Sequence, residues 1–202
     1  MIAAFSCLSR MMDAFLVSTG IVGLAEIGDK TQLLAFLLAA RFRRPLPIVL
    51  GIFVATVANH AFAAAVGALV SELLGPGVMR WVLGLSFLGM AAWVLTPDEI
   101  DAEEAQLAKY GVFLTTLIAF FVAEMGDKTQ VATVALAARY ESMAAIVAGT
   151  TFGMMLANVP AVYFGERIAN RVPLKLVHGI AALIFAVLGI ATLLGMGEGL
   201  GF

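Results

Sequence analysis

Residues 25–32 of the chain read AEIGDKTQ, and residues 123–130 read AEMGDKTQ. The two segments differ at one position and lie 98 residues apart. Each lies within a stretch that is otherwise apolar enough to cross a bilayer. Ionised side chains at that depth cost about 2.5–3.5 kcal/mol each on insertion scales. A chain that places two carboxylates and a lysine there twice must offset this cost, and a cation held by oxygen ligands is the natural candidate.

The composition predicts an integral membrane protein. The chain has 202 residues, of which 62% are hydrophobic and 13% are charged, whereas soluble domains are about half apolar and about a quarter charged. The apolar stretches predict an all-α, polytopic membrane protein with six transmembrane helices, at residues 13–40, 46–70, 78–96, 111–138, 143–166 and 173–195.

The remaining composition excludes several classes. No basic tract indicates a nucleic acid as partner, and the single cysteine, Cys7, excludes an internal disulfide and a thiolate metal site. No signal peptide is expected, because no small-residue cleavage site follows residues 1–12. Met11 or Met12 is an alternative start of the chain.

The chain is an internal duplication. At the same offset of 98 residues, Gly51 matches Gly149, Gly67 matches Gly165 and Phe87 matches Phe185. Three spans in each half put the second half into the membrane from the opposite side, so we expect two inverted three-helix repeats whose motifs face each other. The expected domains are residues 1–96, an acidic connection at 97–109, and residues 110–202. The matched glycines are expected to let helices approach closely.

The charged residues near the span ends predict the orientation. Lys and Arg are enriched on the cytoplasmic side of membrane proteins. One side receives Arg41, Arg43, Arg44, Lys109, Arg167, Arg171 and Lys175, and the other receives Arg10, Arg80 and Arg139. This distribution puts the acidic connection in the cytoplasm and both termini outside it. The connection itself, with Asp98, Glu99, Asp101, Glu103 and Glu104, is interpreted as a surface loop or short helix, or alternatively as a patch that attracts cations.

The motif has the chemistry of a hard-cation site. On a continuous helix Glu26, Asp29, Lys30 and Gln32 would share one polar face. Gly28 would lie opposite and admit another helix, while Thr31 could bond to a backbone carbonyl and bend the helix. Gly and Thr in a polar turn also favour a kink or a short unwinding of the helix, and carbonyl oxygens freed there would add ligands. The second motif repeats the arrangement with Glu124, Gly126, Asp127, Lys128, Thr129 and Gln130.

The charge count indicates what the site could hold. Four carboxylates and two lysines leave a charge of −2, which one divalent cation or two protons would neutralise. The predicted metal ligands are all oxygen: Glu26, Asp29, Gln32, Glu124, Asp127 and Gln130. Such ligands favour Ca²⁺, Mn²⁺ or Mg²⁺ over Zn²⁺ and Cu⁺. The structural alternative is a set of salt bridges that lock two helices together. Lys30 and Lys128 would tether the carboxylates or carry a proton themselves.

Other polar residues in the spans are weaker candidates. Asn59 and His60 lie in one predicted span, and Asn158 lies at the position equivalent to His60. His60 would either bond between helices or relay protons, and the two asparagines could supply carbonyl oxygens. Pro160 is expected to kink its helix. Glu72, Glu166 and His178, at the span ends, are expected at the membrane interface.

The paired E-x-G-D-K-T motif resembles that of the GDT-one family, which includes bacterial manganese exporters and Golgi members that handle Mn²⁺ and Ca²⁺. The resemblance covers the whole chain, and neither copy departs from the family pattern. It implies six helices with the motifs on the first and fourth, and secondary transport of Mn²⁺ or Ca²⁺ against protons. It also implies that Glu26, Gly28, Asp29, Lys30 and Thr31, with Glu124, Gly126, Asp127, Lys128 and Thr129, are the signature positions.

The resulting hypothesis is a Mn²⁺ or Ca²⁺/H⁺ antiporter of the bacterial inner membrane that exports metal from the cytoplasm. The metal is its substrate, and no permanently bound cofactor is expected. An enzyme is not expected, because the lysines would keep the aspartates ionised, whereas an intramembrane aspartyl protease needs them to share a proton. A cation channel and a cationic amino-acid exporter remain alternatives. The oligomeric state is left open.

Overall fold

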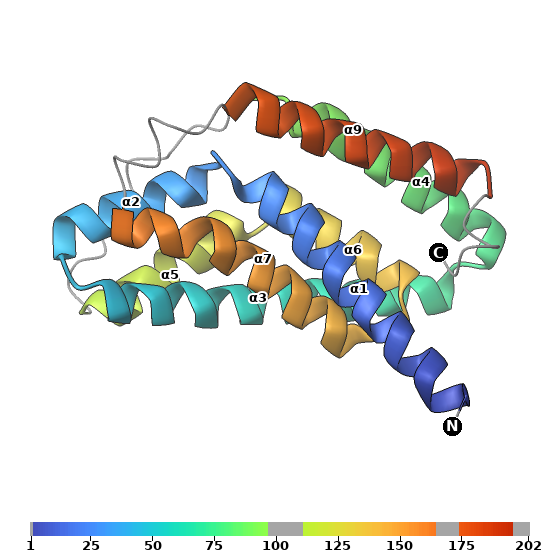
Figure 1. Ribbon diagram of the computed structural model, residues 1–202, viewed down its shortest axis with the longest axis horizontal. Helices are drawn as coiled ribbons and strands as arrows, with labels where there is room; N and C mark the ends of the chain where they lie inside the picture. Colours follow the sequence, from blue (N-terminus) through green and yellow to red (C-terminus); the bar gives the residue numbers. More distant parts are fainter. Residues whose placement is uncertain (1, 97–110, 165–173, 196–202) are drawn as a thin grey trace.

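The computed structural model describes residues 2–96, 111–164 and 174–195, which form eight helices and no strand (Figure 1). The first half contains α1 (Ile2–Glu26), α2 (Lys30–Phe42), α3 (Pro45–Leu73) and α4 (Pro76–Trp93). The second half contains α5 (Val112–Glu124), α6 (Lys128–Arg139), α7 (Met143–Phe164) and α9 (Leu174–Leu193). The all-α prediction is therefore confirmed for the described part of the chain. The predicted acidic connection and Gly165 lie outside it.

Four of these helices are long and apolar enough to span a membrane: residues Leu8–Glu26 of α1, Pro45–Leu73, Met143–Phe164 and Lys175–Leu193. Proline at the first position of α3 is compatible with helix initiation, because that position needs no backbone N–H bond. Pro160 is accommodated inside α7. The protein is an integral membrane protein with helical spans.

The predicted spans 13–40 and 111–138 are not continuous helices. Each is divided into two helices, α1 and α2 in the first half and α5 and α6 in the second. With 13 and 12 residues, α5 and α6 are each only about 20 Å long, too short to cross a hydrocarbon core of about 30 Å alone. The helical-wheel placement, which assumes a continuous helix, is wrong at both places, whereas the short unwinding expected at the motif is confirmed.

A glycine with positive φ produces each break. Gly28 has φ 86° and Gly126 has φ 78°, values that disfavour a side chain. A Cβ on Gly126 would meet nothing within 4 Å, so the backbone conformation requires glycine there. Gly28 has this role in the turn, and the close helix approach expected there stays a prediction. Asp29 and Asp127 follow in extended conformation as the N-caps of α2 and α6.

The two halves pack against each other through equivalent contacts. α1 packs on α7, and α3 packs on α5 and α6. A Cβ on Gly51 would lie 2.9 Å from Phe113 O, and one on Gly149 would lie 2.5 Å from Phe15 O. Phe113 and Phe15 are themselves related by the offset of 98 residues. The duplication is therefore visible in the packing, and these glycines allow the close approach that the sequence predicts.

Two apolar clusters form the core. One contains buried residues of α1, α4, α6 and α9, with contributions from α3 and α7. The other contains buried residues of α2, α3, α5 and α7. Each break joins a helix of the first cluster to a helix of the second. The polar motifs therefore lie at the boundary between two apolar regions.

Candidate metal centre

The breaks bring four buried carboxylates into the interior. Glu26 and Glu124 are the last residues of α1 and α5, and neither is exposed. Asp29 and Asp127 directly precede α2 and α6 and are 4% and 3% exposed. Burial of so many acids is costly unless each is paired or binds a cation.

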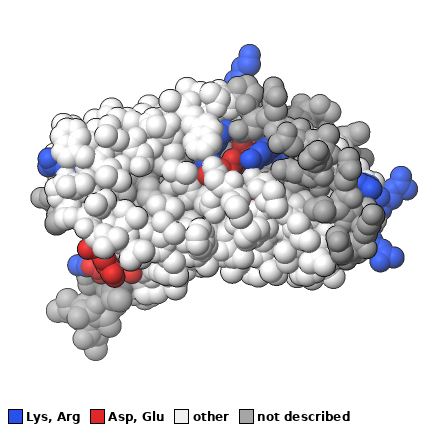
Figure 2. Space-filling model, turned by 180° about the vertical axis from the view of Figure 1, so that it is seen from behind, with Lys and Arg blue, Asp and Glu red and all other residues white. Residues whose placement is uncertain are grey.

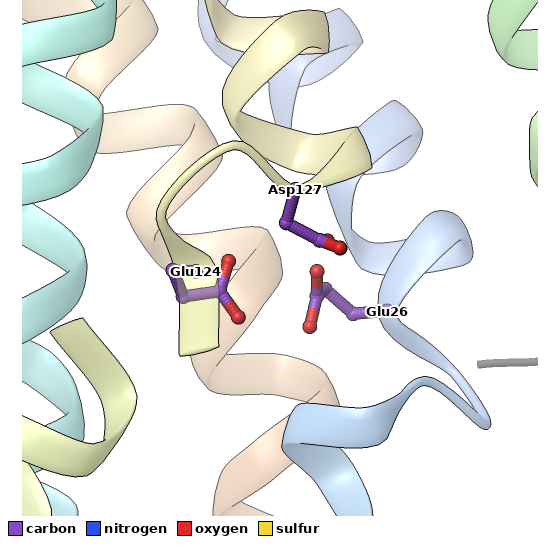
Figure 3. Close-up of side chains that lie close together, drawn as sticks. All are labelled: Glu26, Glu124 and Asp127. Atoms are coloured by element: carbon purple, nitrogen blue, oxygen red, sulfur yellow. The ribbon is translucent and has the colours of Figure 1, made fainter. Parts of the chain in front are cut away.

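Three of the acids converge on one point. Oxygen atoms of Glu26, Glu124 and Asp127 all lie within 4.8 Å of one another. Figure 3 shows the three carboxyl groups pointing toward one another, Glu26 from the end of α1 and the other two from either side of the second break. The two motifs, 98 residues apart in sequence, thus contribute to one acidic cluster.

A threonine hydroxyl holds each glutamate. Thr31 Oγ1 donates to Glu26 Oε2 at 2.7 Å, and Thr129 Oγ1 donates to Glu124 Oε2 at 3.0 Å. The predicted bond from Thr31 to a backbone carbonyl is wrong. The helix begins only at Lys30, so the hydroxyl lies in its first turn, beside the carboxylate across the break.

The lysines pair with the aspartates of the opposite motif. Lys30 Nζ lies 3.4 Å from Asp127 Oδ1, and Lys128 Nζ lies 3.6 Å from Asp29 Oδ1. These pairs cross between the halves and are consistent with a tethering role. The lysine side chains differ in exposure, 25% for Lys30 against 5% for Lys128. The centre is therefore more open on the side of Lys30.

The two glutamates retain unsatisfied oxygen atoms. Oε1 of Glu26 and Oε1 of Glu124 are buried and accept no hydrogen bond from any described residue. Since each aspartate has a lysine beside it, the remaining charge of −2 belongs to these two glutamates when they are ionised. A buried, unsatisfied carboxylate oxygen is costly. One divalent cation or two protons would remove that cost.

The four helix ends add a favourable field. α2 and α6 begin at the centre, and α1 and α5 end there. Helix N-termini stabilise negative charge, and helix C-termini stabilise positive charge. The N-termini therefore favour ionised aspartates, while the C-termini that carry the glutamates favour a cation between them.

The two glutamines close the turns. Gln32 Oε1 accepts a hydrogen bond from Gly28 N at 2.9 Å, and Gln130 Oε1 accepts one from Gly126 N at 2.6 Å. This resembles a capping box, in which the side chain at the third helical position bonds back to the backbone before the helix. Gln32 Nε2 also donates to Ala157 O at 3.0 Å. Their assignment as metal ligands stays a prediction.

The weaker candidates lie on α3 and α7. Asn59 Nδ2 donates to Phe121 O at 3.1 Å, so this amide links α3 to α5. Asn158 Nδ2 donates to Met154 O within its own helix. His60 is buried, and neither ring nitrogen has a hydrogen-bond partner among the described residues. The role of His60 in proton relay stays a prediction.

Sequence reasoning missed two groups at the breaks. His178 Nε2 lies 2.9 Å from Ile27 O, inside the first break, and the interfacial position expected for His178 stays a prediction. Because a carbonyl oxygen can only accept, Nε2 carries the hydrogen. Lys128 Nζ also donates to Thr96 O at 3.4 Å. One signal in the sequence could have drawn attention to His178, because the duplication pairs it with Arg80, another basic residue.

One face of the molecule agrees with a membrane location. The face in Figure 2 is almost uncharged, with a small group of acidic and basic side chains near its middle and further charges toward the ends. An apolar helical body that encloses a charge-paired acidic centre is typical of carriers that move ions across membranes.

Comparison with known proteins identifies the family. Both halves match the family described as "Divalent cation/proton antiporter GDT1", over residues 14–102 and 112–199. The chain belongs to this family and is a transporter, not an enzyme. The resemblance noted from the motif is confirmed, and each half matches the family separately.

Several relatives extend over most of the chain. It is 49% identical over 184 residues to a Vibrio cholerae protein named "Putative manganese exporter", covering 91% of this chain and 92% of the relative. It is 26% identical to "GDT1-like protein sll0615" of Synechocystis, over 90% of this chain and 97% of that protein. It is 29% identical to "GDT1-like protein 4" of Oryza sativa, over 87% and 71% respectively. No solved structure matches the chain.

Proposed function

We propose that this protein exports Mn²⁺ from the cytoplasm in exchange for protons, with Ca²⁺ as an alternative substrate. The observation that carries the proposal is the pair of buried glutamates, each with one oxygen fixed by a threonine and the other without a hydrogen-bond partner among the described residues. A centre with this charge accepts one divalent cation or two protons. Mutually exclusive occupancy is the minimum requirement for exchange. The name of the Vibrio cholerae relative supports manganese as the metal.

The proposed ligands are carboxylates. Glu26, Glu124 and Asp127 would bind the ion directly, since their oxygens already converge. Asp29 is the symmetric counterpart of Asp127 and completes the acidic set. Gln32 and Gln130 remain candidate ligands through their amide oxygens. An all-oxygen set of this kind suits Mn²⁺ and Ca²⁺, which accept carboxylates readily.

The proposed topology is two inverted three-helix repeats. Gly51 lies against Phe113, Asn59 bonds to Phe121, and Gly67 lies against Ala137, so α3 runs in the same direction as α5 and α6. The short turn at 43–44 reverses the chain between α2 and α3. The two broken helices would therefore run in opposite directions, which supports inversion.

The proposed orientation is that of a bacterial inner-membrane protein. The α2–α3 turn, with Arg41, Arg43 and Arg44, lies at one end of the molecule (Figure 1). Parts of the chain that carry Arg10, Arg80 and Arg139 lie toward the other end. The more basic end would face the cytoplasm, together with the acidic connection.

Exchange in proteoliposomes tests the proposal. Glu26→Gln and Asp127→Asn should each reduce Mn²⁺-dependent proton movement by at least about a hundredfold, because each removes a proposed carboxylate ligand of the metal. Glu72→Gln, an exposed acid at the end of α3, is the matched control and should transport normally. Full exchange by both site variants would refute the assignment.

A further inference from the structure

α4 and α9 form a pair that is distinct from the other helices (Figure 1). The two helices pack tightly, since a Cβ on Gly84 would lie 2.5 Å from Leu193 Cγ and one on Gly189 would lie 2.9 Å from Gly84 O. Phe87 and Phe185 stack with their ring centroids 6.4 Å apart. Only 17% of the α9 span is buried, against 61% of the α7 span. The pair is therefore tightly packed internally and lies at the outside of the helical body.

The pair rests on the body through an apolar surface. Buried side chains of the pair form one apolar cluster with residues of α1 and α6. The pair contributes Met79, Leu83, Phe87, Met90, Val94, Ala181, Ala182 and Phe185, and the other two helices contribute Ala14, Ile21, Ala25, Ala132 and Ala135. This contact is apolar, and its methionine side chains can adapt to a changed position of the pair.

Two polar contacts fix one end of the pair to the metal centre. His178, in the first turns of α9, donates to Ile27 O in the first break at 2.9 Å. Thr96, just after α4, accepts from Lys128 at the start of α6 at 3.4 Å. Both contacts lie where α4 ends and α9 begins. The same end of the pair therefore touches both breaks.

The opposite end has the properties of a hinge. Only Leu74 and Gly75 separate α3 from α4, so the start of α4 must stay close to the end of α3. A Cβ on Gly75 would meet nothing within 4 Å, which leaves room for the link to change direction. Arg80, the counterpart of His178, lies toward this end. The two positions related by the duplication therefore have different surroundings, since His178 contacts the metal centre and Arg80 lies near the Leu74–Gly75 link.

We propose that the α4–α9 pair is the gate of the metal centre, hinged at Leu74–Gly75 and latched by the bond from His178 to Ile27 O. The latch must break in each transport cycle for the centre to open on that side. This inference rests on the proposed function for what the gate admits, but the movement itself can be measured without transport.

Distances between spin labels test the movement in the full chain, reconstituted in lipid with Cys7→Ser. One label replaces Leu176, exposed on α9, and the other replaces Leu37, exposed on α2. Two distance populations are expected, with the ratio shifted by pH or by Ca²⁺, a diamagnetic probe ion. The control pair, Leu37 and Phe53, lies within the body on α2 and α3 and should give one unchanged distance.

The latch is tested by adding His178→Ala to the labelled protein. Loss of one hydrogen bond, about 1 kcal/mol, should raise the open-to-closed ratio about fivefold. His178→Gln, which keeps an N–H donor, should restore the ratio at least in part. A single distance between the labels at Leu176 and Leu37, unchanged by pH, by Ca²⁺ and by His178→Ala, would overturn the gate. Gate movement without Mn²⁺ exchange would instead count against the proposed function alone.

Discussion

At the residue scale, the centre divides four acids into two kinds. Asp29 and Asp127 each lie beside a lysine of the other half, whereas Glu26 and Glu124 each lie beside a threonine hydroxyl. A lysine neutralises its aspartate, but a hydroxyl only orients its glutamate. In the proposed exchange, the glutamates are therefore the groups on which metal and protons would compete.

Thr31→Val should weaken metal binding. The hydroxyl donates to Glu26 and stabilises its ionised form more than its protonated form, so its loss favours the proton over the metal. A hydrogen bond to a charged group contributes about 1.5 kcal/mol or more, which predicts about a tenfold loss of Mn²⁺ affinity at neutral pH. The pH at which binding is half-maximal should also rise, because more hydroxide is needed to remove the proton.

Titration of the purified protein with Mn²⁺ at several pH values measures both effects. Thr150→Val is the control, because this buried hydroxyl bonds to Ile146 O within α7. Equal affinities for Thr31→Val and Thr150→Val across the pH range would contradict the role of Thr31.

At the element scale, the two breaks determine how the motif works. A positive-φ glycine, an extended aspartate and a glutamine that bonds back across the turn recur in both halves. Because of the turn, each glutamate is the last residue of one helix, and the aspartate three residues later is the N-cap of the next helix.

Gly126→Ala should destabilise the protein by about 1–2 kcal/mol, because an L-residue is strained at φ 78° even where space is open. Gly89→Ala is the matched control, since Gly89 also has open space but lies within α4. This second change should be neutral or stabilise by up to about 1 kcal/mol. Thermal unfolding of both variants in lipid checks the difference, and equal stabilities would contradict the conformational explanation.

The sequence was sufficient for the composition of the centre but not for its geometry. Duplication and hydropathy identify the acids and indicate that the two motifs meet. A helical wheel, however, assumes an unbroken helix, and the break at Gly28 moves Asp29 and Thr31 to new positions. The contact of His178 with Ile27 O joins segments 151 residues apart, and it exists only because the break frees that carbonyl.

At the scale of the whole molecule, crossed ion pairs join the two halves. Lys30 reaches Asp127 and Lys128 reaches Asp29, so each half neutralises an acid of the other. These pairs connect the centre to the packing of the halves, and their loss should affect stability as well as transport.

Lys128→Met should destabilise the protein by about 3–5 kcal/mol, because it removes the cation beside a buried aspartate. Adding Asp29→Asn should recover part of that loss, and the double-mutant cycle should give a clear coupling energy. Arg10→Met is the control, since its pair with Glu141 is exposed, and it should change stability little. Additive effects of Lys128→Met and Asp29→Asn would show that the pair is not coupled.

The most direct test of the central claim is anomalous diffraction at the manganese edge from crystals grown with Mn²⁺. One strong peak is expected between Glu26 and Glu124, within bonding distance of both, and it should disappear in acidic crystals as protons replace the metal. A peak elsewhere, or one that persists unchanged in acid, would contradict a shared site for metal and protons.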